Sequence, residues 1–89
     1  MDIIATDEFE RQYRQLPVQV RRKAKKQEKF FRNDPFHPSL RTEKLEPKSK
    51  ELWSFRVDRQ YRILFRFLDN STAYFLTIGT HDWIYKLRL

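Results

Sequence analysis

Strict alternation of apolar and polar side chains dominates the second half of the chain and most constrains its fold. Residues 53–57 (WSFRV) and 61–67 (YRILFRF) place large apolar side chains at every second position, as a strand with one buried face does. Polar triplets at 58–60 and 69–71 separate these segments from each other and from the apolar segment 73–78. Two short turns in succession predict an antiparallel meander. Its third strand is expected to be central, because it is apolar on both faces.

The N-terminal third of the chain predicts one strand and two helices. Asp2–Ala5 is short enough to be an edge strand. Thr6 is a suitable N-cap for a helix that ends near Leu16, because acidic residues follow it in the first turn. Pro17 suits the first turn of a second helix, which the Asn-Asp-Pro sequence at 33–35 ends. Two helices joined by so short a turn form a hairpin.

These segments together predict an α+β fold in a single domain, residues 1–89. An N-terminal edge strand and the helical hairpin pack on one face of the antiparallel meander, and a short helical tail follows the last strand. The opposite sheet face is then only partly covered. Residues 35–50 contain three prolines and indicate a long loop, of the kind that is usually functional or mobile.

A strong positive charge narrows the partners of this domain. The formal net charge is +7 and the pI is about 10.0. Such a chain attracts nucleic acid or an acidic protein, although a basic surface can also serve solubility alone. The chain has no cysteine, no apolar run long enough to span a membrane and no basic-then-apolar signal pattern at its N-terminus. We therefore expect a cytoplasmic protein that contacts no membrane.

Metal and nucleotide chemistry have no support in the residues. The two histidines have no partners at metal-ligand spacing, so no metal site is expected. Gly79 is the only glycine, which excludes a glycine-rich phosphate loop and with it a nucleotide triphosphatase. No cofactor is expected.

Three arginines lie at the polar positions of the alternating strands. Arg56, Arg62 and Arg66 should therefore share the sheet face opposite the helices. Like charges on one face repel unless an anion lies between them, and arginine binds phosphate through paired hydrogen bonds that lysine cannot reproduce. The alternative is a solvated face on which Asp58 and Asp69 neutralise the arginines. Phosphate binding is the preferred interpretation.

Three stretches resemble a known family: HPSLRTEKL at 37–45, LWSFRVDRQYRILFRF at 52–67 and IGTHDWIY at 78–85. With the order of elements, they resemble the RelE/ParE toxins of bacterial toxin–antitoxin pairs over essentially the whole chain. The resemblance implies a metal-free endoribonuclease that cleaves mRNA, typically within the ribosome, and that an antitoxin neutralises in a hetero-oligomeric complex. Two alternatives stay open: a ParE-type toxin that inhibits DNA gyrase by binding, and a catalytically weak toxin that acts through protein contacts.

The resemblance also implies roles for individual residues. The strand arginine that holds the scissile phosphate matches Arg62, with Arg56 as its neighbour. The C-terminal histidine and aromatic positions of the site match His81 and Tyr85. The chain departs from lysine-rich versions of this site, and Glu43 is its nearest loop carboxylate.

His81 and Tyr85 are the candidates for proton transfer. Metal-free cleavage requires the 2′-hydroxyl to attack its own phosphate, one group to accept the proton and another to protonate the leaving 5′-oxygen. Imidazole exchanges protons efficiently near neutral pH. The alternative for His81 is a capping or hydrogen-bonding role after Gly79 and Thr80. Tyr85, one helical turn further on, either stacks on a base, shares the acid role or only packs the tail.

Other basic residues are candidates for contact with the RNA backbone. They are three lysines of the predicted loop and one strand arginine: Lys44, Lys48, Lys50 and Arg66. Exposed lysines are common in loops, so solvated side chains are the alternative. The basic run of the second helix is interpreted as a solvated face, although it would also suit ribosomal RNA or an acidic antitoxin segment.

Overall fold

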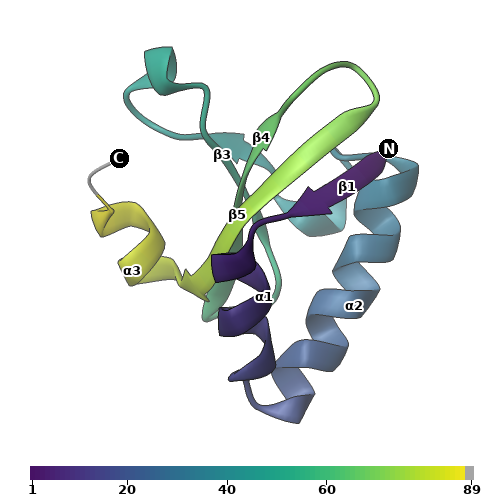
Figure 1. The fold of residues 1–89 in the computed structure, drawn as a ribbon, viewed down its shortest axis with the longest axis vertical. Coiled ribbons are helices and arrows are strands. Elements are labelled where there is room, and N and C mark those ends of the chain that lie inside the picture. Colours follow the sequence, from purple (N-terminus) through teal and green to yellow (C-terminus); the bar gives the residue numbers. More distant parts are fainter. Residues whose placement is uncertain (88–89) are drawn as a thin grey trace.

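A five-stranded sheet forms the centre of the computed structural model, which describes residues 1–87 (Figure 1). The strands lie in the order β1-β5-β4-β3-β2. They are β1 (Asp2–Ala5), β2 (Glu43–Lys44), β3 (Trp53–Arg56), β4 (Tyr61–Phe67) and β5 (Thr72–Thr80). The helices are α1 (Asp7–Arg14), α2 (Val18–Asn33) and α3 (His81–Lys86). This architecture confirms the predicted α+β fold.

The predicted meander is confirmed, and the edge strand makes the sheet mixed. β3, β4 and β5 pair antiparallel in succession, with Phe55 opposite Ile63 and Ile63 opposite Ile78. β5 is a central strand rather than an edge strand, as predicted, because β4 pairs with one of its edges and β1 with the other. β1 and β5 run parallel, with Ile3 opposite Ala73. The direction of this pair depends on contacts between distant parts of the chain, which no local pattern encodes.

Helices α1 and α2 cover one face of the sheet and enclose the main core (Figure 1). Phe31 of α2 is fully buried at its centre. Its ring centroid lies 5.0 Å from those of Phe55 and Phe65 and 5.3 Å from that of Phe75. Phe9 of α1 contacts Phe75 from the other side, at 5.4 Å. Tilted and edge-to-face ring contacts of this kind add to the free energy of apolar burial.

One polar side chain crosses the interface between α2 and the sheet. Gln27 is buried, and its Nε2 donates to the backbone oxygens of Arg56 at 2.8 Å and Ser39 at 3.0 Å. A buried amide with two acceptors avoids the cost of an unpaired polar group. Gln27 thereby fixes the backbone of Arg56, one of the predicted site residues.

Residues 35–50, predicted as a loop, contain regular structure. β2 lies in this segment and pairs with β3, so that Glu43 faces Ser54 and Lys44 faces Trp53. Two residues are too few to show alternation, which is why the sequence did not reveal this strand. The pairing sends Glu43 and Lys44 to opposite faces of the sheet. Single 3₁₀ turns span Pro38–Leu40 and Lys48–Lys50.

α3 covers part of the other sheet face. Leu45, Leu64 and Ile84 form a small second core beneath it. The Trp83 ring lies against Gly79, where an added Cβ would come within 2.2 Å of Trp83 Cε3. The glycine is therefore required by the close approach of α3 to β5.

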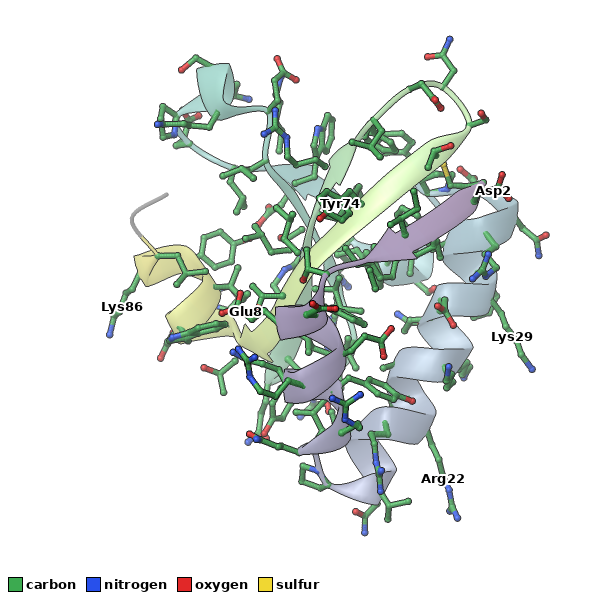
Figure 2. All side chains as sticks on the ribbon, in the orientation of Figure 1. Asp2, Glu8, Arg22, Lys29, Tyr74 and Lys86 are labelled. Carbon is green, nitrogen blue, oxygen red and sulfur yellow. The ribbon has the colours of Figure 1, made fainter. Side chains whose placement is uncertain are left out.

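The outer face of α2 is basic and exposed. Arg22 and Lys29 point away from the body of the protein (Figure 2). α2 is the longest helix, with 16 residues. Among residues 1–87, neither it nor the other helices are long and apolar enough to cross a membrane.

Candidate active site

Arg62 of β4 is the best-anchored residue of the predicted site. It is only 7% exposed. Its Nε donates to Ser54 Oγ at 2.9 Å, and its Nη2 donates to the backbone oxygens of Arg41 at 2.8 Å and Ser54 at 3.3 Å. Within residues 1–87, these bonds leave Nη1 without a protein acceptor. The guanidinium is therefore held in one orientation with donor capacity to spare, and the alternative of a solvated side chain does not apply to it.

Two charged residues modify the electrostatics of Arg62. Arg56 is its register partner across β3 and β4, so both side chains lie on the same face. Glu43 lies on that face as well, opposite Ser54. Burial lowers the pKa of Arg62; the Glu43 carboxylate opposes this shift and the Arg56 cation adds to it. Arg56 and Arg62 carry two positive charges and Glu43 carries one negative charge. The remaining positive charge would be neutralised by an anion such as phosphate.

A chain of contacts leads from Arg62 to His81. Ser54 Oγ, which binds Arg62, lies 3.4 Å from the Tyr85 hydroxyl of α3. The Tyr85 ring packs against the His81 imidazole, with centroids 4.4 Å apart. These two residues lie one turn apart on α3. The fold thus brings together an arginine, a tyrosine and a histidine that are distant in the sequence.

The side chain of His81 is available at the start of α3. Its backbone N–H donates to Gln60 O at 2.6 Å, which anchors the helix to the turn between β3 and β4. The imidazole is exposed, with Nδ1 3.6 Å from a carboxylate oxygen of Asp82. The N-cap is Thr80, whose hydroxyl accepts from Trp83 N at 3.3 Å. The capping alternative for His81 is therefore excluded.

The acidic residues considered as partners of the arginines are engaged elsewhere. Asp58 accepts from Gln60 N at 2.8 Å and lies 3.7 Å from Lys23 Nζ. Asp69 accepts from the backbone N–H and the hydroxyl of Ser71, which lowers the pKa of Asp69. Among the described residues, neither pairs with the arginines of the site.

The prediction that places Lys44 in a loop is wrong, because this residue belongs to β2. It points to the helix-covered face, where Nζ lies 3.2 Å from a carboxylate oxygen of Glu51 and 5.8 Å from the Trp53 ring. An ion pair and a cation–π contact hold the side chain there. These contacts hold the Lys44 ammonium group beside Glu51 and Trp53, while the residue also lines the groove next to the site.

A groove beside the site contains two of the predicted RNA-binding lysines. It has a volume of about 350 Å³, lies between α3 and the segment that contains β2, and is lined by Lys44, Lys50 and Tyr85 among others. Lys48 is exposed in the same 3₁₀ turn. Arg66 does not join this cluster: it lies four residues beyond Arg62 on β4, about 13 Å away at the usual rise of a strand.

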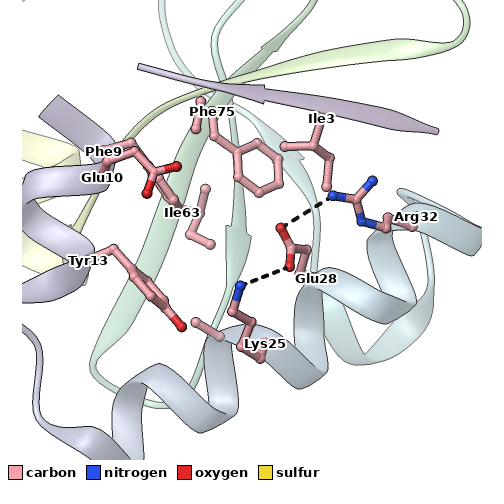
Figure 3. A pocket seen from close by; sticks show the side chains of 11 residues that line it. Ile3, Phe9, Glu10, Tyr13, Lys25, Glu28, Arg32, Ile63 and Phe75 are labelled. Carbon is pink, nitrogen blue, oxygen red and sulfur yellow. Dashed lines mark ion pairs between the residues drawn. The ribbon is translucent and has the colours of Figure 1, made fainter. Parts of the chain in front are cut away.

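A second cavity lies on the helix-covered face, between α1, α2 and the sheet (Figure 3). Its volume is about 180 Å³ and its lining includes Phe9 and Phe75. Glu28, which also lines it, forms ion pairs with Lys25 at 3.8 Å and Arg32 at 3.7 Å (Figure 3). Lys25 and Arg32 are both engaged in ion pairs with Glu28, and no predicted catalytic residue lines this cavity. The candidate site is therefore on the α3 face.

Sequence reasoning missed Ser54 as a member of the site. Ser54 lies two residues before Arg56 in β3, so both side chains point to the same face of the sheet. This alternation was the one sequence feature that could have identified Ser54 as a neighbour of the arginines. A serine among apolar residues carries no chemical signature of its own, so its contacts with Arg62 and Tyr85 become visible only in the fold.

Comparison by sequence identifies a family for this chain. A model of the family described as "RelE-like toxin of type II toxin-antitoxin system HigB" matches residues 34–81, just over half of the chain. The match spans β2 to the start of α3 and includes Arg56, Arg62 and His81. No curated protein sequence matches the chain significantly.

Solved structures share the fold at low sequence identity. A YoeB/ParE toxin from Agrobacterium tumefaciens has a TM-score of 0.75 and 16% identity, over 91% of this chain and 99% of its own. YafQ from E. coli has a TM-score of 0.72 and 18% identity, over 94% and 97%. A chain of the archaeal RelE–RelB complex from Pyrococcus horikoshii has a TM-score of 0.72 and 14% identity, over 89% and 92%. Together with the family match, this common fold shows that the chain belongs to the HigB-like RelE family of toxins of type II toxin–antitoxin systems.

Proposed function

We propose that this protein is an endoribonuclease toxin that cleaves mRNA on the ribosome without a metal ion. The observation that supports this is the anchored guanidinium of Arg62, which Ser54 links to Tyr85, and the exposed imidazole of His81 against the Tyr85 ring. An anion site beside a proton-transfer group is what cleavage by 2′-hydroxyl attack requires. A toxin that acts only by binding has no need of this combination.

The reaction converts one phosphodiester into two ends. The 2′-oxygen bonds to phosphorus, and the bond from phosphorus to the 5′-oxygen breaks. The products are a 2′,3′-cyclic phosphate and a 5′-hydroxyl. One group accepts the 2′-proton, a second donates a proton to the 5′-oxygen, and cations stabilise the charge that develops on the phosphorane.

The residues of the site suit these roles. Arg62 and Arg56 supply the cations. His81 exchanges one of the two protons, because its imidazole is exposed on the site. Glu43 lies on the same sheet face, and we propose it as the carboxylate that exchanges the other proton. Tyr85 supports the imidazole through its ring and directs its hydroxyl toward the same site.

Exposed cations around the site are proposed to guide the RNA backbone. Lys50 lines the groove beside Tyr85, and Lys48 lies in the same turn. Arg66 is exposed further along β4 and would contact a more distant phosphate. Lys44, whose charge is paired with Glu51, contributes least. Contacts of this kind make binding weaken as salt rises.

An acidic antitoxin is the proposed protein partner. The net charge of +7 favours an acidic segment laid over the basic surface. RelE of Pyrococcus horikoshii is solved as a complex with RelB, and a hetero-oligomer with an antitoxin is proposed here by analogy. A ribosome-directed function places this protein in the cytoplasm.

Translation of a defined mRNA with purified protein tests this function, with cuts mapped by primer extension and ribosome-free RNA run in parallel. We expect cuts in the wild-type reaction that require ribosomes. His81→Ala should slow cleavage by about 10²- to 10⁴-fold, the usual contribution of general acid–base catalysis. Lys86→Ala is the matched control, because Lys86 lies on the same helix and its side chain points outward from α3 (Figure 2).

Two results would contradict the proposal. Intact mRNA in the presence of folded wild-type protein would remove the ribonuclease function, and a gyrase supercoiling assay would then test the ParE-type alternative. Full cleavage by folded His81→Ala would retain the function but show that the assigned proton-transfer group is wrong.

A further inference from the structure

Ser54 contacts both halves of the candidate active site. It lies in β3 and is fully buried. Its hydroxyl oxygen is 2.9 Å from Arg62 Nε and 3.4 Å from the Tyr85 hydroxyl, and its backbone oxygen accepts from Arg62 Nη2 at 3.3 Å. This residue therefore connects β3 and β4, which carry the arginines, to α3, which carries the proton-transfer groups.

The directions of these hydrogen bonds follow from the donors present. Arg62 Nε can only donate, so Ser54 Oγ accepts from it. The hydroxyl hydrogen of Ser54 then needs an acceptor, because an unpaired donor in a buried site costs free energy. Among residues 1–87, the remaining partner of this hydroxyl is Tyr85. Ser54 accordingly donates to Tyr85, and the Tyr85 hydroxyl hydrogen is directed away from Ser54 and stays available to a substrate.

We propose that Ser54 is a positioning residue, which sets the orientation of the Arg62 guanidinium and of the Tyr85 hydroxyl for RNA cleavage. This inference rests on the proposed ribonuclease function. Ser54 touches no reacting atom. It acts through Arg62, which holds the scissile phosphate, and through Tyr85, whose outward hydroxyl donates a hydrogen bond to the RNA.

Thr77 offers a matched comparison within the same sheet. Its hydroxyl is also buried, and the register places Ser54, Leu64 and Thr77 in one row across β3, β4 and β5. Direct cross-strand neighbours lie on the same face. Thr77 Oγ1 has no hydrogen-bond partner among residues 1–87. The hydroxyl of Ser54 is thus connected to the site and that of Thr77 is not. Comparing a variant that lacks the first hydroxyl with a variant that lacks the second distinguishes a positioning role from the general effect of deleting a buried hydroxyl.

Cleavage kinetics of Ser54→Ala and Thr77→Val on ribosome-bound mRNA test the proposal. Ser54→Ala should lower kcat by about 10- to 100-fold, because a misplaced catalytic group costs up to about 10²-fold. Its KM should change by less than about threefold, since the loss falls on the transition state. Thr77→Val should retain the wild-type kcat. Ser54→Thr should restore kcat at least in part, because it returns a hydroxyl to the same place.

A double-variant cycle with Tyr85→Phe separates orientation from lost stability. If Ser54 acts through the Tyr85 hydroxyl, Ser54→Ala slows the Tyr85→Phe protein far less than it slows wild type. Equal slowing in both backgrounds overturns the proposal, and so does a kcat of Ser54→Ala equal to that of Thr77→Val. Circular dichroism establishes that each variant is folded. Should Ser54→Ala not fold, Ser54→Cys replaces it with the same criteria, because its side chain has the same branching and its thiol is only a weak donor and acceptor.

The outcomes distinguish this inference from the function on which it rests. A wild-type protein that leaves mRNA intact overturns the ribonuclease function, and the positioning role with it. Cleavage by wild type together with an unchanged kcat in Ser54→Ala overturns the positioning role alone.

Discussion

The two faces of the sheet are closed in different ways. On one face, α1 and α2 enclose a core of aromatic rings around the fully buried Phe31. On the other, the six-residue α3 covers only a small apolar cluster around Leu64. That second face keeps the hydrogen-bonded Arg62, the Tyr85 contact and an adjoining groove. The comparison shows that stability is concentrated on one face of the strands and candidate chemistry on the other.

Alternation along the strands makes this division possible. In β4, Ile63 and Phe65 belong to the aromatic core, whereas Leu64 belongs to the cluster under α3. Arg62 shares the face of Leu64, because the two lie at alternate positions. A substitution on the helix-covered face should therefore change mainly the stability, and a substitution on the α3 face mainly the candidate site, provided that the substituted residues share no contact partners.

The largest effect is expected in the aromatic core. Phe31→Ala should lower the free energy of unfolding by about 3–5 kcal/mol, because it removes a buried ring and leaves a cavity among three phenylalanines. Urea unfolding followed by circular dichroism measures this loss. Phe36→Ala is the control: Phe36 is 55% exposed and should cost far less. Equal losses in both variants would show that the core is not concentrated around Phe31.

An intermediate effect is expected where α3 meets the sheet. Gly79→Ala places a Cβ within 2.2 Å of the Trp83 ring, which forces Trp83 and α3 to shift. Overpacking of this kind costs about 1–3 kcal/mol. Amide NMR shifts should change in α3 and leave α2 unaltered, and cleavage should fall because His81 and Tyr85 move. Asn70→Ala, in the turn at the other end of β5, is the control. Shifts spread equally through α2 would contradict the independence of the two faces.

The smallest effect is expected at Lys44. Lys44→Ala removes one partly exposed ion pair with Glu51, worth about 0–1 kcal/mol and screened by salt. Because the charge of Lys44 is already paired with Glu51, affinity for a non-cleavable RNA should be nearly unchanged, whereas Lys50→Ala should weaken it. Fluorescence anisotropy measures both. A larger loss of affinity in Lys44→Ala than in Lys50→Ala would restore Lys44 as an RNA contact.

Much of the fold follows from local patterns. The period of two in residues 53–67 predicts strands and turns, because it expresses which side chains face a core. Phe9, Tyr13 and Leu16 recur at positions i, i+4 and i+7 and predict the helix α1 for the same reason. β2 escaped prediction because two residues have no period. The candidate site was predicted in part for the same reason. The alternation of side chains along β3 and β4 puts Arg56 and Arg62 on one face of the sheet. The same alternation also predicted Arg66, which lies about 13 Å from Arg62.

The sequence by itself determined which side chains occupy each face of the strands, where the helices begin and end within a few residues, and the positive charge of the surface. The tertiary structure decided which of those side chains meet. It paired Lys44 with Glu51, buried Arg62, and brought the hydroxyl of Ser54 within 3.4 Å of that of Tyr85. The physical reason is range: alternation and capping act between neighbours along the chain, whereas the site depends on how α3 and β2 dock on a sheet built from distant segments.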